Sequence, residues 1–389
     1  MKKVLIFSTA YYPYVGGAEV AVKEITDRIK NIEFDMITAL MDRKLKRKEK
    51  IGNINVCRYG FGFKTLDKFL LPFFGFYFSF KKNKYKIIWS IMASHASVLA
   101  SIYKLINRKT KLLLTLQEGD EETYLERYVC GIKILYKIFI KPWHLLVFKK
   151  ADYITVISSY LKKRAKKNKA NCKIEIIPNA VDIDNFFQKY SKDELNNLKL
   201  KLNKSQEDKY LITTSRLVLK NAVDDIIKSL KYLPDNIKFL ILGSGSDEVK
   251  LKELVNKENV KNRVKFLGLV DQKEIPKYLK ISDIFIRPSL SEGFGNSFVE
   301  AMAIGIPVIA TPVGGIVDFL FDPEKNKDKK PTGFFCNVRD PKSIAVQVKK
   351  IINNKELSNE IVNNAKKMVI EKYDWNIIAK KMDNIFKKI

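Results

Sequence analysis

Histidine and cysteine are scarce in this chain of 389 residues, and that scarcity excludes two kinds of site. The two histidines, His95 and His144, are too few for a zinc cluster, because zinc sites draw mainly on histidine and cysteine. The four cysteines stand far apart with no paired spacing: Cys57, Cys130, Cys172 and Cys336. We therefore expect free thiols in a reducing compartment, with neither a disulfide framework nor a metal site.

Long apolar runs are also missing. No uninterrupted apolar stretch approaches the roughly 20 residues that a membrane-spanning helix needs. Met1-Lys2-Lys3 leads straight into a short strand-like run, unlike a secretory signal. Glycine (17) and proline (12) are few, and 46% of the residues are apolar, as in a soluble globular protein. We expect a cytoplasmic protein, and leave open peripheral contact with the inner face of the plasma membrane.

Acidic residues are outnumbered by basic ones, 43 to 72, which leaves a net charge of +29. Such an excess attracts nucleic acid or anionic membranes. However, arginine is scarce beside lysine, and no signature of a nucleic-acid-binding module is present. We interpret the lysines as the bias of an AT-rich genome together with some membrane attraction, and expect no nucleic-acid partner.

Strand-like and helix-like segments alternate along the chain, which is typical of an α/β protein with parallel sheets. In the first half, strands are expected at residues 4–8, 34–39, 55–58, 87–91, 111–116, 153–157 and 174–177. Helices are expected there at residues 18–30, 95–106 and 159–169. The second half predicts strands at residues 210–214, 238–242, 264–267, 284–287 and 308–310. Helices at residues 341–353, 355–372 and 375–388 close the chain.

The length predicts two domains, because single cores seldom grow past about 250–300 residues. The polar segment 182–206 is rich in lysine and asparagine, so we predict a linker there. The expected domains are therefore residues 1–190 and 205–373.

Two glutamates, Glu292 and Glu300, flank a glycine-containing turn in the second domain. The preceding residues 283–288 predict a short buried strand that ends at proline. After the turn, Asn296 or Ser297 is expected to cap a helix whose first turn carries Glu300 inward. A strand, a glycine turn and a helix N-terminus form a site for phosphate. One carboxylate could then accept hydrogen bonds from a sugar and the other from a ribose.

Four further motifs accompany this pattern in a fixed order. They are Gly16-Gly17-Ala18-Glu19, Ile177-Pro178-Asn179-Ala180-Val181-Asp182, Ser215-Arg216-Leu217-Val218-Leu219-Lys220-Asn221 and Gly305-Ile306-Pro307-Val308-Ile309-Ala310-Thr311-Pro312-Val313-Gly314-Gly315. Each is weak alone, but the ordered set spans nearly the whole chain. It resembles glycosyltransferase family 4, whose members carry an E-x7-E signature.

The resemblance implies the GT-B fold, two Rossmann-like α/β domains facing a cleft. The final helix, about 374–389, would pack back on the first domain. The implied reaction is transfer of a sugar, with retention of configuration, from a nucleotide-diphosphate sugar to a hydroxyl of a glycan or lipid-linked acceptor. Such a reaction belongs to cell-surface polysaccharide or glycolipid synthesis. It requires no cofactor beyond the donor.

The resemblance also assigns roles to residues of the second domain. Arg216 and Lys220 would bind the diphosphate, since arginine offers a bidentate fork and lysine a compact charge. The commoner family lysine falls at the position of Asn221, which makes Lys220 less secure than Arg216. Glu292 would bind the donor sugar and Glu300 the ribose. The nucleotide crevice would also include Gly243, Gly295, Asn296 and Ser297.

On the first domain, Gly16 and Gly17 would let the backbone approach the donor phosphate, although a plain strand-to-helix turn explains them too. The chain departs from the family after the strand at 111–116, where Gln117 replaces a frequent histidine. Gln117 is expected to bond a sugar hydroxyl. Glu118 or Asp120 would orient the acceptor or take its proton, or else form an acidic loop before a helix.

Three other polar sites are not expected to take part in catalysis. His95 is expected at a helix start or on the acceptor side, and His144 lies in a basic and apolar helix and is expected to be structural. Asp182-Ile183-Asp184 looks like a D-x-D metal motif, but its place in the segment 177–182 argues against metal binding.

Two aromatic and basic segments, residues 66–80 and 132–150, suggest contact with anionic membrane. Core packing explains most of these residues equally well. Other functions remain open as well: a catalytically silent, basic membrane- or nucleic-acid-binding protein, or another two-Rossmann enzyme such as a nucleotide-sugar epimerase or a phosphorylase.

Overall fold

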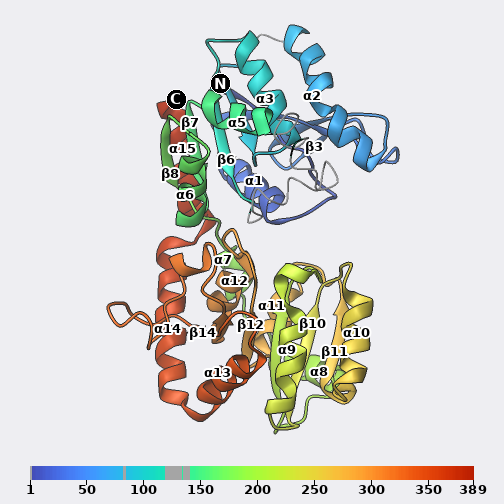
Figure 1. Ribbon diagram of the computed structural model, residues 1–389, viewed down its shortest axis with the longest axis vertical. Coiled ribbons are helices and arrows are strands. Elements are labelled where there is room, and N and C mark those ends of the chain that lie inside the picture. Colours follow the sequence, from blue (N-terminus) through green and yellow to red (C-terminus); the bar gives the residue numbers. More distant parts are fainter. Residues whose placement is uncertain (1, 82–84, 119–133, 135–140) are drawn as a thin grey trace. The chain divides into compact units, whose positions relative to one another are not determined.

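The computed structural model describes residues 2–81, 85–118, 134 and 141–389, which form two compact α/β units (Figure 1). The first unit contains Met1–Asn179 and Trp375–Ile389, and the second contains Ala180–Asp374. Each unit is built on its own largely parallel sheet. The expected fold class of two α/β domains is therefore confirmed.

The sheet of the first unit has the strand order β3-β4-β2-β1-β5-β6-β7-β8. Its strands are β1 (Lys2–Phe7), β2 (Ile32–Ala39), β3 (Lys48–Ile51), β4 (Ile54–Tyr59), β5 (Ile87–Ile91), β6 (Lys111–Leu116), β7 (Tyr153–Val156) and β8 (Lys173–Ile176). All neighbours pair in parallel except β3, which runs antiparallel to β4. The central strands are buried along most of their length, as expected for a sheet covered on both faces.

Six described helices accompany this sheet: α1 (Gly17–Arg28), α2 (Lys64–Lys81), α3 (His95–Ile106), α5 (Lys141–Lys150), α6 (Ser159–Lys167) and α15 (Trp375–Lys388). Helix α3 packs against α2 and α5, and α1 packs against α15. In α15, Phe386 is fully buried against Phe34 and Trp89, with ring centroids 5.9 and 5.3 Å away. The last helix thus belongs to the core of the first unit.

The sheet of the second unit has the order β11-β10-β9-β12-β13-β14, and all its pairs are parallel. Its strands are β9 (Lys209–Thr214), β10 (Ile237–Leu242), β11 (Val264–Gly268), β12 (Ile284–Arg287), β13 (Val308–Ala310) and β14 (Phe334–Phe335). Its helices are α7 (Ile183–Phe187), α8 (Lys192–Lys201), α9 (Val223–Ser229), α10 (Glu248–Lys257), α11 (Ile275–Lys280), α12 (Asn296–Ile304), α13 (Pro341–Asn353) and α14 (Lys355–Lys372). Short 3-10 turns are η3 (Leu219–Asn221), η4 (Leu230–Tyr232), η5 (Lys261–Arg263) and η6 (Ile316–Asp318). A buried aliphatic core joins this sheet to α9, α10 and α13.

The predicted linker at 182–206 is wrong, because this segment forms α7 and α8 of the second unit. Local capping explains the helices. Asp182 accepts a hydrogen bond from the backbone N–H of Asn185, and Ser191 and Glu194 form a reciprocal capping box. Among the described residues, no helix combines the length and apolarity required to cross a bilayer.

Candidate functional site

The candidate residues of the second unit lie where the carboxyl ends of β9 and β12 meet. The sheet reverses its order here, with β10 and β11 on one side of β9 and β13 and β14 beyond β12. Open parallel sheets bind ligands at such a reversal, because the loops diverge and leave a crevice. The two loops are joined directly, since the backbone N–H of Leu290 donates to the carbonyl of Lys220 at 2.7 Å.

The loop after β9 supplies the two cations of the site, Arg216 and Lys220. Arg216 is exposed, and Lys220 is partly buried in η3. Asn221, which stands where the family more often has lysine, is 5% exposed and donates its side-chain amide to the carbonyl of Arg216 at 2.6 Å. Asn221 therefore holds the backbone of Arg216, and the positive charges of this loop come from Arg216 and Lys220.

The glycines after β10 let that loop pack directly on the Arg216 loop. Gly243 has φ +134°, and a Cβ there would lie 1.9 Å from the carbonyl oxygen of Ser215. A Cβ on Gly245 would lie 2.2 Å from the carbonyl oxygen of Leu217. The backbone N–H of Leu217 also donates to Ser244 at 2.9 Å. Both glycines thus have a steric role in fixing the backbone beside Arg216.

The turn after β12 holds Glu292 from several directions. Its Oε2 accepts a hydrogen bond from Arg287 Nη2 at 2.5 Å, and its Oε1 accepts one from the backbone N–H of Gly293 at 3.1 Å. Its carbonyl accepts from the backbone N–H of Gly315 at 3.0 Å. Gly314 has φ +57°, and a Cβ there would lie 1.8 Å from the same carbonyl oxygen. The carboxylate is consequently fixed while its side chain remains 19% exposed.

Helix α12 begins at Asn296, directly behind Gly295, and this N-cap glycine has no side chain with which to cap the first turn. The expectation that Asn296 or Ser297 caps this helix is therefore wrong. Gly295 occupies the capping position with φ +96°, and a Cβ there would lie 2.4 Å from the Phe298 ring. Ser297 instead accepts a hydrogen bond from Arg287 Nη1 at 2.7 Å. A helix start without a side-chain cap suits an anionic ligand.

Glu300 lies on α12 between the buried residues Val299 and Ala301. Burial raises the pKa of Glu300 to about 7, and the positive charge of Arg287 opposes this rise. A carboxylate with this pKa changes its charge within the physiological range, and only its ionised form accepts hydrogen bonds with both oxygens.

In the first unit, Gly16 and Gly17 open helix α1. Gly16 is the N-cap in an extended conformation, and its backbone N–H donates to Glu19 Oε2 at 2.8 Å. Neither glycine has a positive φ. The turn is an ordinary helix start with Glu19 closing a capping box. Contact with the donor phosphate remains a prediction for both glycines.

The residues after β6 bind neighbouring loops. Gln117 Oε1 accepts a hydrogen bond from the side-chain amide of Asn179 at 3.1 Å. The Glu118 carboxylate accepts from the backbone N–H groups of Ala93 at 2.9 Å and Gln117 at 3.0 Å. Glu118 therefore joins the loops after β5 and β6, and its role toward an acceptor stays a prediction. Asp120 lies outside the described residues.

The two histidines lie in helices of the first unit, and a role of His95 toward an acceptor stays a prediction. His95 is the first residue of α3, as predicted, with its ring 4.9 Å from that of Phe69. Burial and the nearby charge of Lys68 lower the pKa of His95. His144 is 6% exposed in α5 and packs against Phe148 at 5.2 Å.

Comparison with known proteins identifies the family. Residues 15–185 match the family model described as Glycosyltransferase Family 4, and residues 196–368 match the one described as Glycosyl transferases group 1. The chain belongs to glycosyltransferase family 4. The resemblance found in the ordered motifs is thereby confirmed, and so is glycosyltransferase activity at the level of the family.

Individual relatives agree with this assignment. The chain is 30% identical to the uncharacterized glycosyltransferase MJ1607 of Methanocaldococcus jannaschii over 217 residues, which are 55% of this chain and 54% of the relative. That match therefore spans about half of the relative's length. Another uncharacterized glycosyltransferase of that organism, MJ1069, is 28% identical over 407 residues, covering 100% of this chain and 98% of the relative.

Among solved structures, Anabaena HepE in complex with UDP and glucose is similar with a TM-score of 0.79. The identity is 18%, and the match covers 100% of each chain. At this identity the likeness shows the fold alone, which is the two-domain GT-B fold of glycosyltransferases.

Sequence reasoning overlooked Arg287 of this glycosyltransferase. The side chain is 8% exposed, contacts both Glu292 and Ser297, and lies 4.4 Å above the Phe298 ring. A signal was present, because a lone arginine at the end of an apolar strand needs an anionic partner when buried. Glu292, a few residues later, was the nearest candidate.

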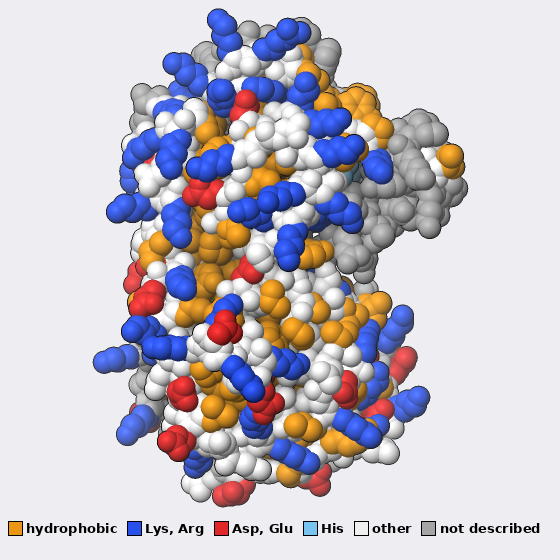
Figure 2. Space-filling view, turned by 60° about the vertical axis from the view of Figure 1, so that its left-hand side comes forward, with side chains coloured by type: hydrophobic (Ala, Val, Ile, Leu, Met, Phe, Trp, Pro, Cys, Tyr) orange, Lys and Arg blue, Asp and Glu red, His pale blue; other side chains and the backbone are white. Residues whose placement is uncertain are grey.

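The positive charge of the glycosyltransferase is shared unevenly between its units. Both carry similar numbers of lysines and arginines, but the acidic residues lie mainly in the second unit. Most of the net charge of +29 therefore belongs to the first unit. Figure 2 shows lysine and arginine side chains spread over the visible face of the molecule.

Proposed function

We propose that this glycosyltransferase moves a sugar from a nucleotide-diphosphate sugar to a hydroxyl of a glycan or lipid-linked acceptor, with retention of configuration. The proposed setting is cell-surface polysaccharide or glycolipid synthesis. One observation carries the proposal: two cations, a helix start with glycine at its N-cap and two carboxylates converge from the ends of β9 and β12. These groups are Arg216, Lys220, the first turn of α12, Glu292 and Glu300.

The positive groups would stabilise the departing diphosphate. Negative charge develops on its oxygens as the bond to the sugar breaks, and fixed positive groups lower the energy of that transition state. Arg216, Lys220 and the start of α12 supply such a field, and the backbone beside Arg216 is already fixed by Gly243 and Gly245. The proposed mechanism calls for no cofactor, because these groups provide the positive charge.

The two carboxylates would orient the donor. Glu292, held by Arg287, would accept hydrogen bonds from hydroxyls of the transferred sugar. Glu300 would accept them from the ribose once it is ionised. Because the solved structure of HepE holds UDP and glucose, UDP-sugars are the first donors to test.

We also propose peripheral contact of the first unit with anionic lipid, at the inner face of the plasma membrane. Large apolar side chains of α2 are exposed: Leu66 by 47%, Phe69 by 41% and Phe73 by 72%. Apolar insertion together with basic surface is the usual combination in interfacial binding.

Donor binding provides the test of the proposed function. The full-length protein would be incubated with UDP-, GDP- and ADP-sugars, and thermal stabilisation and slow donor hydrolysis would be measured. Glu300→Ala is expected to lose the response, whereas Glu360→Ala, which removes an exposed carboxylate from α14, should keep it. The anomeric form first released, read by NMR, should match that of the donor. A folded protein that neither binds nor hydrolyses any of the donors, or that inverts the configuration, would contradict the proposal.

A further inference from the structure

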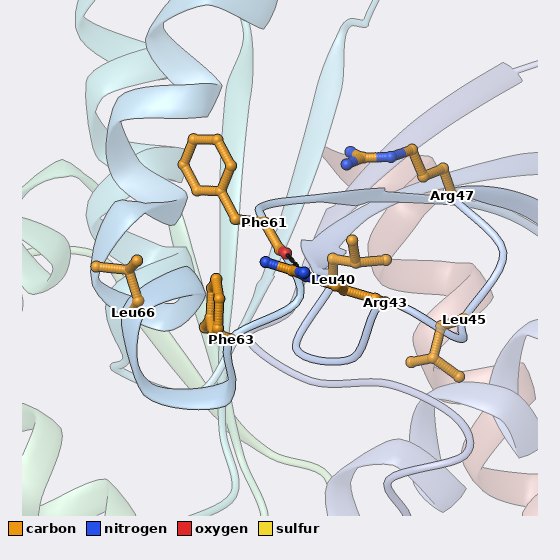
Figure 3. Close-up of a pocket in the computed structure, with 7 residues that line it drawn as sticks. All are labelled: Leu40, Arg43, Leu45, Arg47, Phe61, Phe63 and Leu66. Atoms are coloured by element: carbon orange, nitrogen blue, oxygen red, sulfur yellow. Dashed lines mark hydrogen bonds between the residues drawn. The ribbon is translucent and has the colours of Figure 1, made fainter.

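A hollow of about 350 Å³ lies in the first unit, outside the donor residues discussed above. Its walls come from two loops, one after β2 and one after β4 that continues into α2 (Figure 3). The lining residues are Leu40, Arg43, Leu45, Arg47, Phe61, Phe63 and Leu66. A second hollow of about 550 Å³ shares Phe63 and Leu66 with it. Volumes of this size suit small ligands.

The hollow combines apolar walls with two arginines. Phe61 is 55% exposed, Phe63 51% and Leu66 47%, so each offers apolar surface to a ligand. Arg43 donates to the carbonyl of Phe61 at 3.1 Å and lies 4.6 Å above the Phe63 ring. Arg47 donates to the carbonyl of Gly60 at 3.1 Å.

The arginines are available for an anion. In the part of the chain that the structure describes, no carboxylate pairs with Arg43 or Arg47. Each uses one nitrogen of its guanidinium group on a backbone carbonyl, and the same planar fork can bind phosphate oxygens through others. Both side chains are exposed, line the hollow and have no charged partner among the described residues.

The walls are held in place by a buried carboxylate. Asp67 of α2 is 0% exposed and accepts hydrogen bonds from the backbone N–H of Met41 at 3.0 Å, in the loop after β2. On the other side it accepts from three N–H groups at 2.7–3.2 Å, those of Phe61, Gly62 and Phe63. Asp67 thus ties both walls together, and the hollow is built before any ligand arrives.

The hollow also lies at the carboxyl edge of the parallel strands of its sheet. Both wall-forming loops follow the carboxyl ends of parallel strands, at the edge where Gly16 follows β1. Arg58 joins the loops, since it donates to the carbonyls of Lys46 and Tyr12, both at 2.7 Å. Lys64 of α2 lies 5.8 Å from the Tyr14 ring in the loop after β1.

We infer that this hollow binds the acceptor as a phosphate-bearing lipid. Arg43 and Arg47 bind the phosphate, and the first part of the hydrocarbon chain covers Phe61, Phe63 and Leu66. Charge complementarity selects this occupant, because an uncharged lipid would leave two arginines unpaired and free phosphate would leave the apolar wall in water. The inference rests on the proposed transfer to a lipid-linked acceptor and names the chemistry of that acceptor.

The test uses farnesyl phosphate, farnesol and inorganic phosphate with the full-length protein in the absence of donor. Calorimetry below the micellar range of each probe should show farnesyl phosphate binding at least tenfold tighter than the other two. Arg43→Gln and Arg47→Gln should each weaken its binding by about tenfold or more, and Phe63→Ser should weaken both lipids. The glutamines keep a donor for the backbone carbonyls, so the loops should stay folded.

Lys44→Gln is the matched control, because it removes one exposed positive charge from the same loop without lining the hollow. It should change farnesyl phosphate binding less than twofold. Equal loss in the control, equal binding of inorganic phosphate, or no binding of farnesyl phosphate would overturn the inference. If farnesyl phosphate does not bind but the protein is retained on anionic vesicles, Arg43 and Arg47 would instead contact a membrane surface.

Donor hydrolysis separates this inference from the proposed function. Arg43→Gln and Arg47→Gln should hydrolyse the donor at the wild-type rate, since neither residue belongs to the donor site. Probe binding without any donor response would count against the transferase proposal alone. Donor response without probe binding would count against the hollow alone.

Discussion

The two units share an architecture but build their strand-end loops differently. In the second unit, backbone packs on backbone: a Cβ on Gly243 or Gly314 would lie within 2 Å of a carbonyl oxygen of the facing loop. In the first unit, the corresponding edge carries exposed side chains such as Phe61, Phe63 and Arg43. Gly62 of the first unit is tight as well, since a Cβ there would lie 2.7 Å from the backbone nitrogen of Arg43. This edge of the first unit also exposes large apolar side chains that the other described residues leave partly uncovered.

This difference fits the two tasks proposed for the units, donor binding by the second and acceptor binding by the first. A diphosphate is the same in every nucleotide sugar, so it can be bound by fixed backbone and a few charges. Acceptors differ in shape and polarity, and their recognition depends on side chains in variable loops. The uneven charge fits the same proposed division, because an acid-poor first unit would attract the proposed anionic partners.

Arg216→Ala should have the largest effect if the second unit alone binds the diphosphate. We expect the turnover number to fall by about 10²–10³, as for loss of a group that stabilises developing negative charge. Steady-state kinetics with the preferred donor would measure it. Lys257→Ala removes an exposed cation at the far end of α10 and should leave turnover unchanged. If turnover falls equally in both variants, Arg216 does not belong to the donor site.

Gly243→Ala tests the locked loops of the second unit. The substitution combines a positive φ with a Cβ 1.9 Å from Ser215, so the free energy of unfolding should fall by about 3 kcal/mol. Urea denaturation would measure the loss. Gly268→Ala is the matched comparison, because Gly268 has φ +68° but no atom within 4 Å of its added Cβ. If Gly243→Ala lowers the free energy of unfolding no more than Gly268→Ala does, the backbone at Ser215 moves to make room for the added Cβ.

Glu300 makes the second unit sensitive to pH. Since its ionised form would bind the ribose and its pKa is about 7, affinity for a UDP-sugar should rise about tenfold from pH 6 to pH 8. The sugar diphosphate has no group that titrates in this range. The Glu300→Gln variant should bind the UDP-sugar weakly at both pH 6 and pH 8. If its affinity still rises about tenfold between these pH values, a group other than Glu300 is titrating.

The free energy of unfolding should change with pH in the opposite direction to donor affinity, falling as pH rises. The folded pKa of Glu300 lies above its ordinary value of 4.5, so the native state binds this proton more tightly than the unfolded chain does. The stabilisation from this group is present at low pH and is lost as pH rises through about 7, by at most about 3 kcal/mol. Denaturation of wild type and Glu300→Gln at pH 5 and pH 8 would show whether the difference between them follows this course.

Gly16→Ala should have the smallest effect, in contrast to Gly243→Ala. Gly16 is extended, and the added Cβ would meet only the flexible carboxylate of Glu19, at 2.9 Å. We expect stability to change by about 1 kcal/mol or less. If turnover nevertheless falls more than tenfold, the backbone of Gly16 does approach the donor, and the comparison of the two units must be revised.

The sequence predicts elements with local signals better than elements whose pairing depends on distant partners, in both units. The apolar strands at 284–287 and 308–310 and the last three helices have the predicted bounds, because burial and capping signals are local. The short edge strands β3 and β14 escaped notice, since their pairing depends on distant partners. Helices α7 and α8 were hidden by their polar composition.

The same distinction holds for the sites. Arg216 and Glu292 stand in motifs that the family shares, so sequence places them. The ion pair of Arg287 with Glu292 and the hollow beside Arg43 arise from contacts between segments, and only coordinates bring their partners together. Asn221 illustrates the point. The sequence shows only that it stands where the family more often has lysine, whereas the structure shows that its buried side chain donates a hydrogen bond to the carbonyl of Arg216.

Hydrogen exchange with and without the preferred UDP-sugar tests most directly whether the second unit binds the donor. We predict slower exchange in two segments, the loop at 216–221 and the first turn of α12, with the strongest protection at the helix start. Glu300→Ala should abolish it. Protection confined to the first unit, or none in these two segments while the donor is being hydrolysed, would contradict the account.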